Sequence, residues 1–206
     1  MTQTLQIHPE NPEPRLIQRA AEVLIGGGVV VYPTDSTYAL ACHIGDKNAL
    51  ERIRRIRQLS DKHNLTLMCR DLSEISTYAK VSNSAYRLLK AYTPGAYTFI
   101  LPATAEVPRR LMHPKRKTIG LRIPDHPVTL ALLEAVGEPV MSTSLILPDD
   151  EHPLSEIYDI EDQVGKLVDL IVESGACGLE PTTVVDLVEG APQLLRAGKG
   201  DPAPFM

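Results

Sequence analysis

The segment Val29–His43, VVVYPTDSTYALACH, decides how the rest of the chain is interpreted. Three valines lead into Tyr32 and Pro33, a cluster of hydroxyl and carboxylate side chains follows at 34–37, and the segment then turns apolar again. This pattern predicts a buried strand, a tight polar loop and a second buried segment. In open α/β sheets, ligands bind at the carboxyl ends of strands. The polar loop is therefore the first candidate for a binding site.

The bulk composition indicates a globular protein of 206 residues with 43% hydrophobic residues and a formal net charge of −5. A chain of this size can bury a core without cross-links. It contains no apolar run long enough to cross a bilayer, and its N-terminal segment does not resemble a signal peptide. Cys42, Cys69 and Cys177 lack metal-binding spacing, so we expect reduced core thiols in a cytoplasmic protein. The negative charge argues against a strongly basic nucleic-acid binder, but it allows a local basic patch.

Hydrophobic periodicity predicts helices that alternate with short strands. Helices are expected to begin at Asn11-Pro12-Glu13, with Asn11 as the cap and Pro12 in the first turn, after Asp46, and over 72–79, 84–92 and 128–136. Strands are expected over 4–7, from Val29, and over 65–69, 97–101, 119–123, 140–144, 167–172, 183–187 and 193–196. The glycines at 26–28 are expected to end the first helix in the left-handed conformation. Residues 107–118 are predicted as a loop or short helix, and the acidic segment 148–161 as an irregular surface excursion.

This order mixes βα units with strand pairs that no helix separates. It predicts an α/β fold with a single twisted sheet of parallel and antiparallel strands. One domain is placed at 14–198, with the strand at 4–7 and a C-terminal tail at 199–206 attached to it.

Catalytic motifs are largely missing from the chain. It has no Walker or dinucleotide-binding glycine signature, no HExxH, no paired His/Cys spacing and no GxSxG, so no metal site is predicted. Asp35 is the one loop carboxylate placed for acid–base or magnesium chemistry, although such residues often only form turns. Two basic clusters stand out: Arg52, Arg54, Arg55, Arg57 and Lys62, and then Arg109, Arg110, Lys115, Arg116 and Lys117. Each cluster is either a nucleic-acid contact or a solvated face.

Several segments, in order along the chain, resemble the YrdC-like threonylcarbamoyl-AMP synthase superfamily, and within it the YciO branch. VVVYPTDSTYALA is similar to the family signature V-x-x-P-T-[DE]-T-x-Y-G-L-G. The later matches are TPGAYT at 93–98, GLRIPDHP at 120–127, MSTS at 141–144, PTTVVD at 181–186 and LRAG at 195–198. The resemblance covers most of residues 14–198.

The resemblance implies a twisted α/β sheet with a large concave basic cavity. It implies a nucleotide site that makes threonylcarbamoyl-AMP from ATP, bicarbonate and L-threonine for tRNA modification, and it implies affinity for RNA, including double-stranded RNA. Magnesium is expected only because ATP normally carries it, and neither a tightly bound cofactor nor DNA specificity is expected. The expected nucleotide and substrate contacts are Thr34, Ser36, Arg57, Arg122, Ser142, Ser144 and Arg196, since guanidinium forks and hydroxyls suit phosphate oxygens. The two basic clusters, without Arg57, are the expected RNA contacts.

The sequence departs from the synthase pattern at several polar positions. Where the family has K-x-R-P, this chain has Arg57-Gln58-Leu59-Ser60, and where the family has S-x-N it has Ser144-Leu145-Ile146. Two loop glycines are replaced by Ala39 and Ala41. By the resemblance, these changes fall on polar groups expected to handle the triphosphate and the reacting centre, and Leu59 cannot hydrogen-bond a phosphate. A lost charge-assisted bond to a transition state costs about 3 kcal/mol, or roughly a hundredfold in rate.

We therefore expect a nucleotide- and RNA-binding protein in which the synthase chemistry is weakened or altered. The alternative hypotheses are a true threonylcarbamoyl-AMP synthase, and a related ATP-dependent reaction on another amino acid or small acid.

Overall fold

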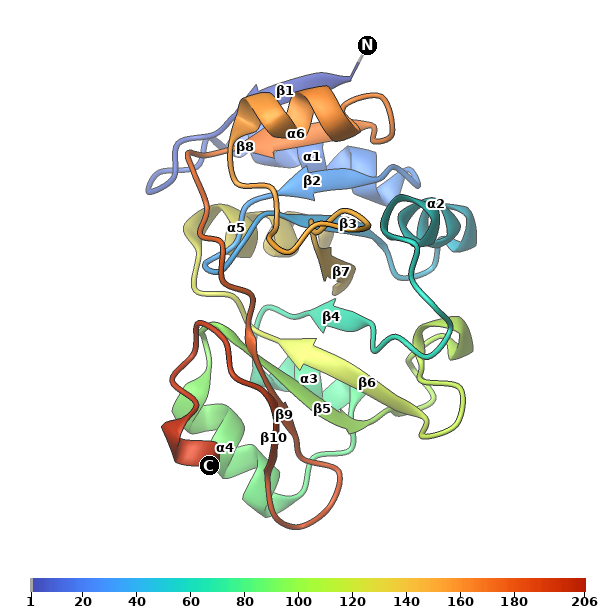
Figure 1. The fold of residues 1–206 in the computed structure, drawn as a ribbon, viewed down its shortest axis with the longest axis vertical. Helices are drawn as coiled ribbons and strands as arrows, with labels where there is room; N and C mark the ends of the chain where they lie inside the picture. The colour runs from blue at the N-terminus through green and yellow to red at the C-terminus, as the bar shows by residue number, and fades with distance from the viewer. Residues whose placement is uncertain (1) are drawn as a thin grey trace.

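One ten-stranded sheet runs through the molecule in the order β1-β8-β2-β3-β7-β4-β6-β5-β9-β10 (Figure 1). The computed structural model describes residues 2–206. The strands are β1 (Gln3–Gln6), β2 (Val30–Tyr32), β3 (Ala39–His43), β4 (Thr66–Met68), β5 (Tyr97–Pro102), β6 (Thr118–Arg122), β7 (Val140–Ser144), β8 (Leu170–Glu173), β9 (Thr183–Asp186) and β10 (Gln193–Arg196). Four pairs are parallel, namely β1–β8, β2–β8, β4–β6 and β5–β9, and the others are antiparallel. The predicted single-domain α/β fold with a mixed sheet is confirmed.

Helices cover both faces of this sheet. They are α1 (Pro14–Ile25), α2 (Lys47–Arg57), α3 (Leu72–Tyr78), α4 (Asn83–Tyr92), α5 (Pro127–Val136) and α6 (Ile157–Val164), with 3-10 helices η1 (Arg109–Leu111) and η2 (Ala203–Phe205). One hydrophobic cluster joins α1 and α5 to strands β1, β2, β3 and β8 through residues such as Leu24, Leu132 and Val30. A second cluster on the other side of the sheet contains residues of α2, α3, α4 and α6. Because successive strand residues point to opposite faces, each central strand contributes to both sides.

The predicted start of the first helix was wrong by a few residues. Glu13 is extended, with φ −72° and ψ 118°, and the helix begins at Pro14. A residue that precedes proline avoids the helical conformation, and Glu13 stands before Pro14. The predicted left-handed stop is confirmed, since Gly27 has φ +91°. Asp46 caps α2 as expected, its carboxylate accepting a bond of 2.8 Å from the Ala49 N–H.

The acidic segment 148–161 was predicted to be irregular, and this is wrong for its end. Helix α6 begins at Ile157, and it buries Ile160 and Val164 one helical turn apart. That i, i+4 pair was the available signal, and the surrounding acidic residues obscured it. Residues 107–118 form a loop with the short helix η1, as predicted.

The C-terminal tail packs into the fold. Phe205 is buried against Tyr92, Tyr97 and Phe99, with ring centroids 5.0, 5.8 and 6.1 Å away. A long connection from β8 to β9 crosses from one half of the sheet to the other (Figure 1). No helix within residues 2–206 has the length and apolar character needed to cross a membrane.

Candidate functional site

A cavity of about 370 Å³ lies on the face of β4, β5 and β6 that α3 and α4 leave uncovered. The alternation of side chains along these strands builds it. Thr66 and Met68 line the cavity while Leu67 enters the core, and Thr98 and Ile100 line it while Phe99 is buried behind them. Gly120 of β6 lies between these strands, and its missing side chain leaves room for the two threonines: a methyl group there would be 2.8 Å from Thr66 Oγ1 and 3.2 Å from Thr98 Cγ2.

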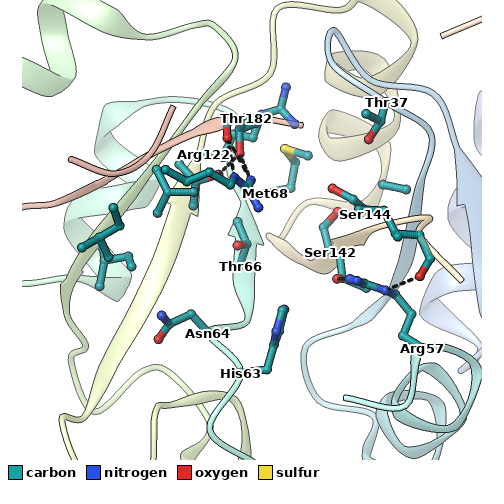
Figure 2. A pocket seen from close by; sticks show the side chains of 18 of the residues that line it. Thr37, Arg57, His63, Asn64, Thr66, Met68, Arg122, Ser142, Ser144 and Thr182 are labelled. Atoms are coloured by element: carbon teal, nitrogen blue, oxygen red, sulfur yellow. Dashed lines mark hydrogen bonds between the residues drawn. The ribbon is translucent and has the colours of Figure 1, made fainter. Parts of the chain in front are cut away.

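The cavity is cationic. Arg57, Lys62, Arg122 and Arg196 line it together with His63, and within residues 2–206 no carboxylate lines it. Figure 2 shows that these side chains come from different parts of the fold, with Arg57 and His63 on one side and Arg122 and Thr182 on the other. Of the four cations, Arg122 alone forms an ion pair with a carboxylate of the described chain.

Arg122 is held by the loop that follows β2. Its guanidinium contacts the Asp35 carboxylate, and its Nη1 donates to Ser36 Oγ at 3.0 Å. Asp35 Oδ2 also accepts from the Asp125 N–H at 3.0 Å. Burial lowers the pKa of Arg122, and the negative charge of Asp35 opposes that shift. The Nε–H of Arg122 is buried without a partner among the described residues, so one donor of the buried guanidinium remains available.

Arg57 enters the cavity from the C-terminal end of α2. The next residue, Gln58, ends the helix in the left-handed conformation with φ 53°. Arg57 Nε donates to the Ile146 carbonyl at 2.9 Å, and Nη1 donates to Thr143 Oγ1. Desolvation lowers the pKa of Arg57, and the positive charge of Arg196 lowers it further. The two guanidinium groups therefore repel each other across the cavity.

Arg196, near the end of β10, is fixed by Thr182. Its Nε and Nη2 donate to the Thr182 carbonyl at 3.0 and 2.8 Å, and Nη2 also reaches Thr182 Oγ1 at 3.2 Å. The neighbouring Gly198 is required by close packing, since a methyl group there would lie 2.3 Å from the Pro181 carbonyl oxygen. These contacts hold the guanidinium plane without neutralising its charge.

The predicted hydroxyl contacts divide into two groups. Ser142 and Ser144 line the cavity on β7, and Ser142 bonds to the buried Tyr32 hydroxyl, whose pKa is raised to about 12 by desolvation. Thr34 and Ser36 do not line it, because Thr34 Oγ1 bonds to the Thr37 carbonyl at 2.6 Å and Ser36 supports Arg122. Asp35, the candidate catalytic residue, likewise lies behind Arg122 rather than on the cavity wall.

Sequence reasoning missed several lining residues, among them Thr37, His63, Asn64, Thr66, Thr98 and Thr182. The signal for Thr66 and Thr98 was a hydroxyl in an otherwise apolar strand, on the face opposite the core residues. No local signal distinguishes His63 and Asn64 from ordinary loop residues.

The two basic clusters disperse in the fold. Arg52 turns away to Asp169 at 2.5 Å, Arg116 pairs with Asp186 at 2.8 Å, and Arg54 pairs with Asp61 at 3.6 Å. Arg54 Nη2 also donates to the Arg110 carbonyl at 3.4 Å, which joins the end of α2 to the loop around η1. Arg55, Arg109, Lys115 and Lys117 are exposed, and Lys62 lies at the cavity.

The departures from the synthase pattern lie in different environments. Ile146 and Ala39 line the cavity, whereas Ala41 is fully buried in the core. Leu59, expected near the phosphates, instead packs against the hydrophobic core and does not line the cavity. The motif comparison therefore placed Leu59 too close to the ligand site, since its side chain is partly buried against the core. Within residues 2–206, no group of three His, Cys, Asp or Glu side chains is arranged to hold a metal.

Residues 22–198 match the family model of the Sua5, YciO and YrdC proteins, described as "Telomere recombination". The chain belongs to this family. It is 59% identical to the uncharacterized protein YciO of Escherichia coli K12 over 206 residues, 100% of both chains. The crystal structure of E. coli YciO superposes with a TM-score of 0.97 over 100% of both chains. P. abyssi Sua5 complexed with L-threonine has a TM-score of 0.88 at 28% identity, covering 96% of this chain and 58% of that protein.

The Asp35–Arg122 pair yields a stability prediction. Replacing Asp35 by Ala leaves a buried guanidinium without its counter-charge, which lowers the free energy of unfolding by about 3 kcal/mol. Urea denaturation followed by circular dichroism measures this change. Asp61→Ala is the matched control, because Asp61 also pairs with an arginine but its side chain is 95% exposed, and its loss costs about 0.5 kcal/mol or less. Equal effects of the two substitutions would contradict a structural role for the buried pair.

Proposed function

We propose that this protein binds a nucleotide, ATP with its magnesium ion, and that the cavity cations hold the phosphates. The observation that carries the proposal is the arrangement of Arg57, Lys62 and Arg196 around one cavity, each without a carboxylate partner in the described chain. Bringing like charges together in a desolvated site costs free energy. A polyphosphate removes that cost and supplies acceptors for the guanidinium donors.

The geometry of the arginines supports phosphate as the ligand. The guanidinium groups of Arg57 and Arg196 are oriented by bonds to backbone carbonyls, so the donors that those bonds leave free keep fixed directions. Fixed planar forks suit the oxygens of phosphate better than a flexible ammonium does. The Arg122 Nε–H and the hydroxyls of Ser142 and Ser144 supply further donors nearby.

One part of the remaining wall is apolar, and we propose that it accommodates the nucleoside. Met68, Ile100, Val184 and Leu195 lie beside the cationic groups. The volume of about 370 Å³ falls in the range of small-molecule sites, which runs from about 300 to 1,000 Å³. Because the described chain brings no carboxylate to the cavity, magnesium would enter on the phosphates of the nucleotide.

Synthesis of threonylcarbamoyl-AMP is the second candidate function. The observation in its favour is the likeness to P. abyssi Sua5, which has been crystallised with L-threonine. Against it stands Ile146, which lines the cavity where the family pattern has the asparagine of S-x-N. A related ATP-dependent reaction on another amino acid or small acid fits the same cavity, with Ile146 as part of an altered specificity pocket.

Besides the nucleotide, we propose RNA as a partner. The two basic clusters are far apart in the sequence, and the contact from Arg54 to the Arg110 carbonyl joins the end of α2 to the loop around η1. Duplex RNA is bound largely through phosphates and 2′-hydroxyls, which suit the exposed cations Arg55, Arg109, Lys115 and Lys117. A cytoplasmic location accompanies the proposal, in keeping with three free cysteines, two of them buried.

Arg57 and Arg55 provide a matched test of nucleotide binding, because both lie on α2 and only Arg57 lines the cavity. Arg57→Gln is expected to weaken Mg-ATP binding by about tenfold or more, since a hydrogen bond to a charged group contributes about 1.5–3 kcal/mol. Isothermal titration calorimetry measures this change. Arg55→Gln is expected to bind like the natural protein. Unchanged affinity of Arg57→Gln, or no Mg-ATP binding by the natural protein, would refute the proposal.

Ile146→Asn tests whether synthase chemistry was lost at the cavity wall. Release of pyrophosphate from Mg-ATP that requires both threonine and bicarbonate is expected to be near background in the natural protein. Restoring one amide donor raises it by about a hundredfold if that group contributes to the transition state. Ile146→Val is the control, since it supplies no donor. Efficient release by the natural protein that depends on both co-substrates would instead establish the synthase function.

RNA binding predicts a strong dependence on salt. For the natural protein and a short RNA duplex, log K is expected to fall linearly with log salt concentration. The triple variant Arg109→Gln, Lys115→Gln, Lys117→Gln removes three exposed cations, and it reduces that slope by about 2–3. Fluorescence anisotropy measures the salt dependence of binding for the natural protein and for the variant. The control is Arg87→Gln with Lys90→Gln on the exposed side of α4. Absence of binding at low salt would rule out this partner.

A further inference from the structure

Among the described residues that line the cavity, His63 is the one whose side-chain charge is not fixed near neutral pH. It follows Lys62 in the loop between α2 and β4, and its backbone N–H donates to the Ser60 carbonyl at 3.1 Å. This turn directs the imidazole into the cavity, where Figure 2 shows it beside Asn64 and across from Arg122. The side chain is thus part of the wall although the residue itself remains exposed.

The ring nitrogens of His63 are free for a ligand. His8, His113 and His126 accept backbone N–H groups through Nδ1, and His43 is bonded to Glu138 at 2.6 Å. Within residues 2–206, the imidazole of His63 makes no such bond. Unlike these four histidines, it therefore has no structural task that would explain its orientation.

The surroundings of His63 are positively charged. Arg54 and Arg57 face it from α2, Arg196 faces it from β10, and Lys62 precedes it. The nearby carboxylate of Asp61 is almost fully exposed and is paired with Arg54. Desolvation in the cavity and then the charges of Arg57, Arg196 and Arg54 lower the pKa of His63. In the free protein these surroundings therefore favour the neutral form of the imidazole.

We infer that His63 is a phosphate ligand that becomes protonated when a polyanion enters the cavity. The phosphates neutralise the arginine charges that disfavour the imidazolium, and they offer oxygens to both N–H groups of the charged ring. The proton comes from the solvent, and no covalent bond of the ligand changes. This inference rests on the proposed nucleotide binding and adds a recognition residue outside the sequence motifs.

The coupling between protonation of His63 and ligand binding predicts the direction in which affinity changes with pH. A group whose pKa rises on binding takes up protons with the ligand, so affinity increases as the pH falls from the bound pKa towards the free pKa. Because desolvation and the arginine charges lower the free pKa below its ordinary value, this window begins below that value and extends up to the pKa of the bound form. Lowering the pH from about 8 to about 6 is expected to tighten Mg-ATP binding by about tenfold.

The test is calorimetric titration of the full chain with Mg-ATP at both pH values, in two buffers of different ionisation enthalpy. The natural protein is expected to take up a fraction of a proton at neutral pH. At the lower pH, His63→Gln is expected to bind Mg-ATP more weakly than the natural protein does, and to take up fewer protons on binding. His63→Lys, which carries a permanent charge, binds tightly at the higher pH with little pH dependence. His152→Gln, at an exposed histidine outside the cavity, is the control and behaves like the natural protein.

Circular dichroism checks that each variant is folded. Binding by the natural protein with the same proton uptake as His63→Gln would overturn this inference and leave nucleotide binding intact. The absence of Mg-ATP binding at both pH values would overturn both proposals.

Discussion

The buried ion pair between Arg122 and Asp35 is the interaction on which the cavity depends. Three strands, β3, β7 and β4, separate β2 from β6 in the sheet, yet the loop after β2 meets the end of β6 through this pair. A charge removed from water without a partner costs several kcal/mol, so the pair ties the two halves of the twisted sheet together. Ser36 and the Asp125 N–H complete the arrangement. The side chains of the polar loop thus serve mainly to position a cation.

The other cavity cations are held in a different way. Arg57 and Arg196 are oriented by carbonyl and hydroxyl oxygens, which fix the guanidinium plane and leave its positive charge unpaired. Mutual repulsion and desolvation make this arrangement unfavourable in the free protein, as the lowered pKa values of Arg57 and His63 reflect. Unfavourable arrangements persist where function requires them. Arg122, neutralised by Asp35, supports the structure of the site. Arg57 and Arg196, which have no carboxylate partner in the described chain, form its proposed binding surface.

The relation to the synthase family follows from where the substitutions lie. The scaffold of Sua5 is kept, with a TM-score of 0.88 at 28% identity. Ile146 changes the chemistry of the cavity wall, whereas Leu59 contributes to the core and leaves the wall unchanged. Under the proposed function, Arg57, Arg122 and Arg196 supply the guanidinium groups suited to phosphate, and Ile146 stands where the family pattern has an asparagine. This distribution is the basis for proposing nucleotide binding with altered chemistry.

The sequence by itself determined most of the elements and their order, α6 excepted, because apolar periodicity and caps are local. Strand β7 lies at the predicted residues, and the Asp46 cap of α2 and the domain type were predictable in the same way. The places that the charged side chains take in the fold could not be predicted from the sequence. Arg52, Arg55 and Arg57 belong to one basic run on one helix, yet the first binds Asp169, the second faces solvent and the third enters the cavity. Those destinations depend on partners such as Asp169 and the Ile146 carbonyl, distant in sequence, which only the tertiary structure brings within reach.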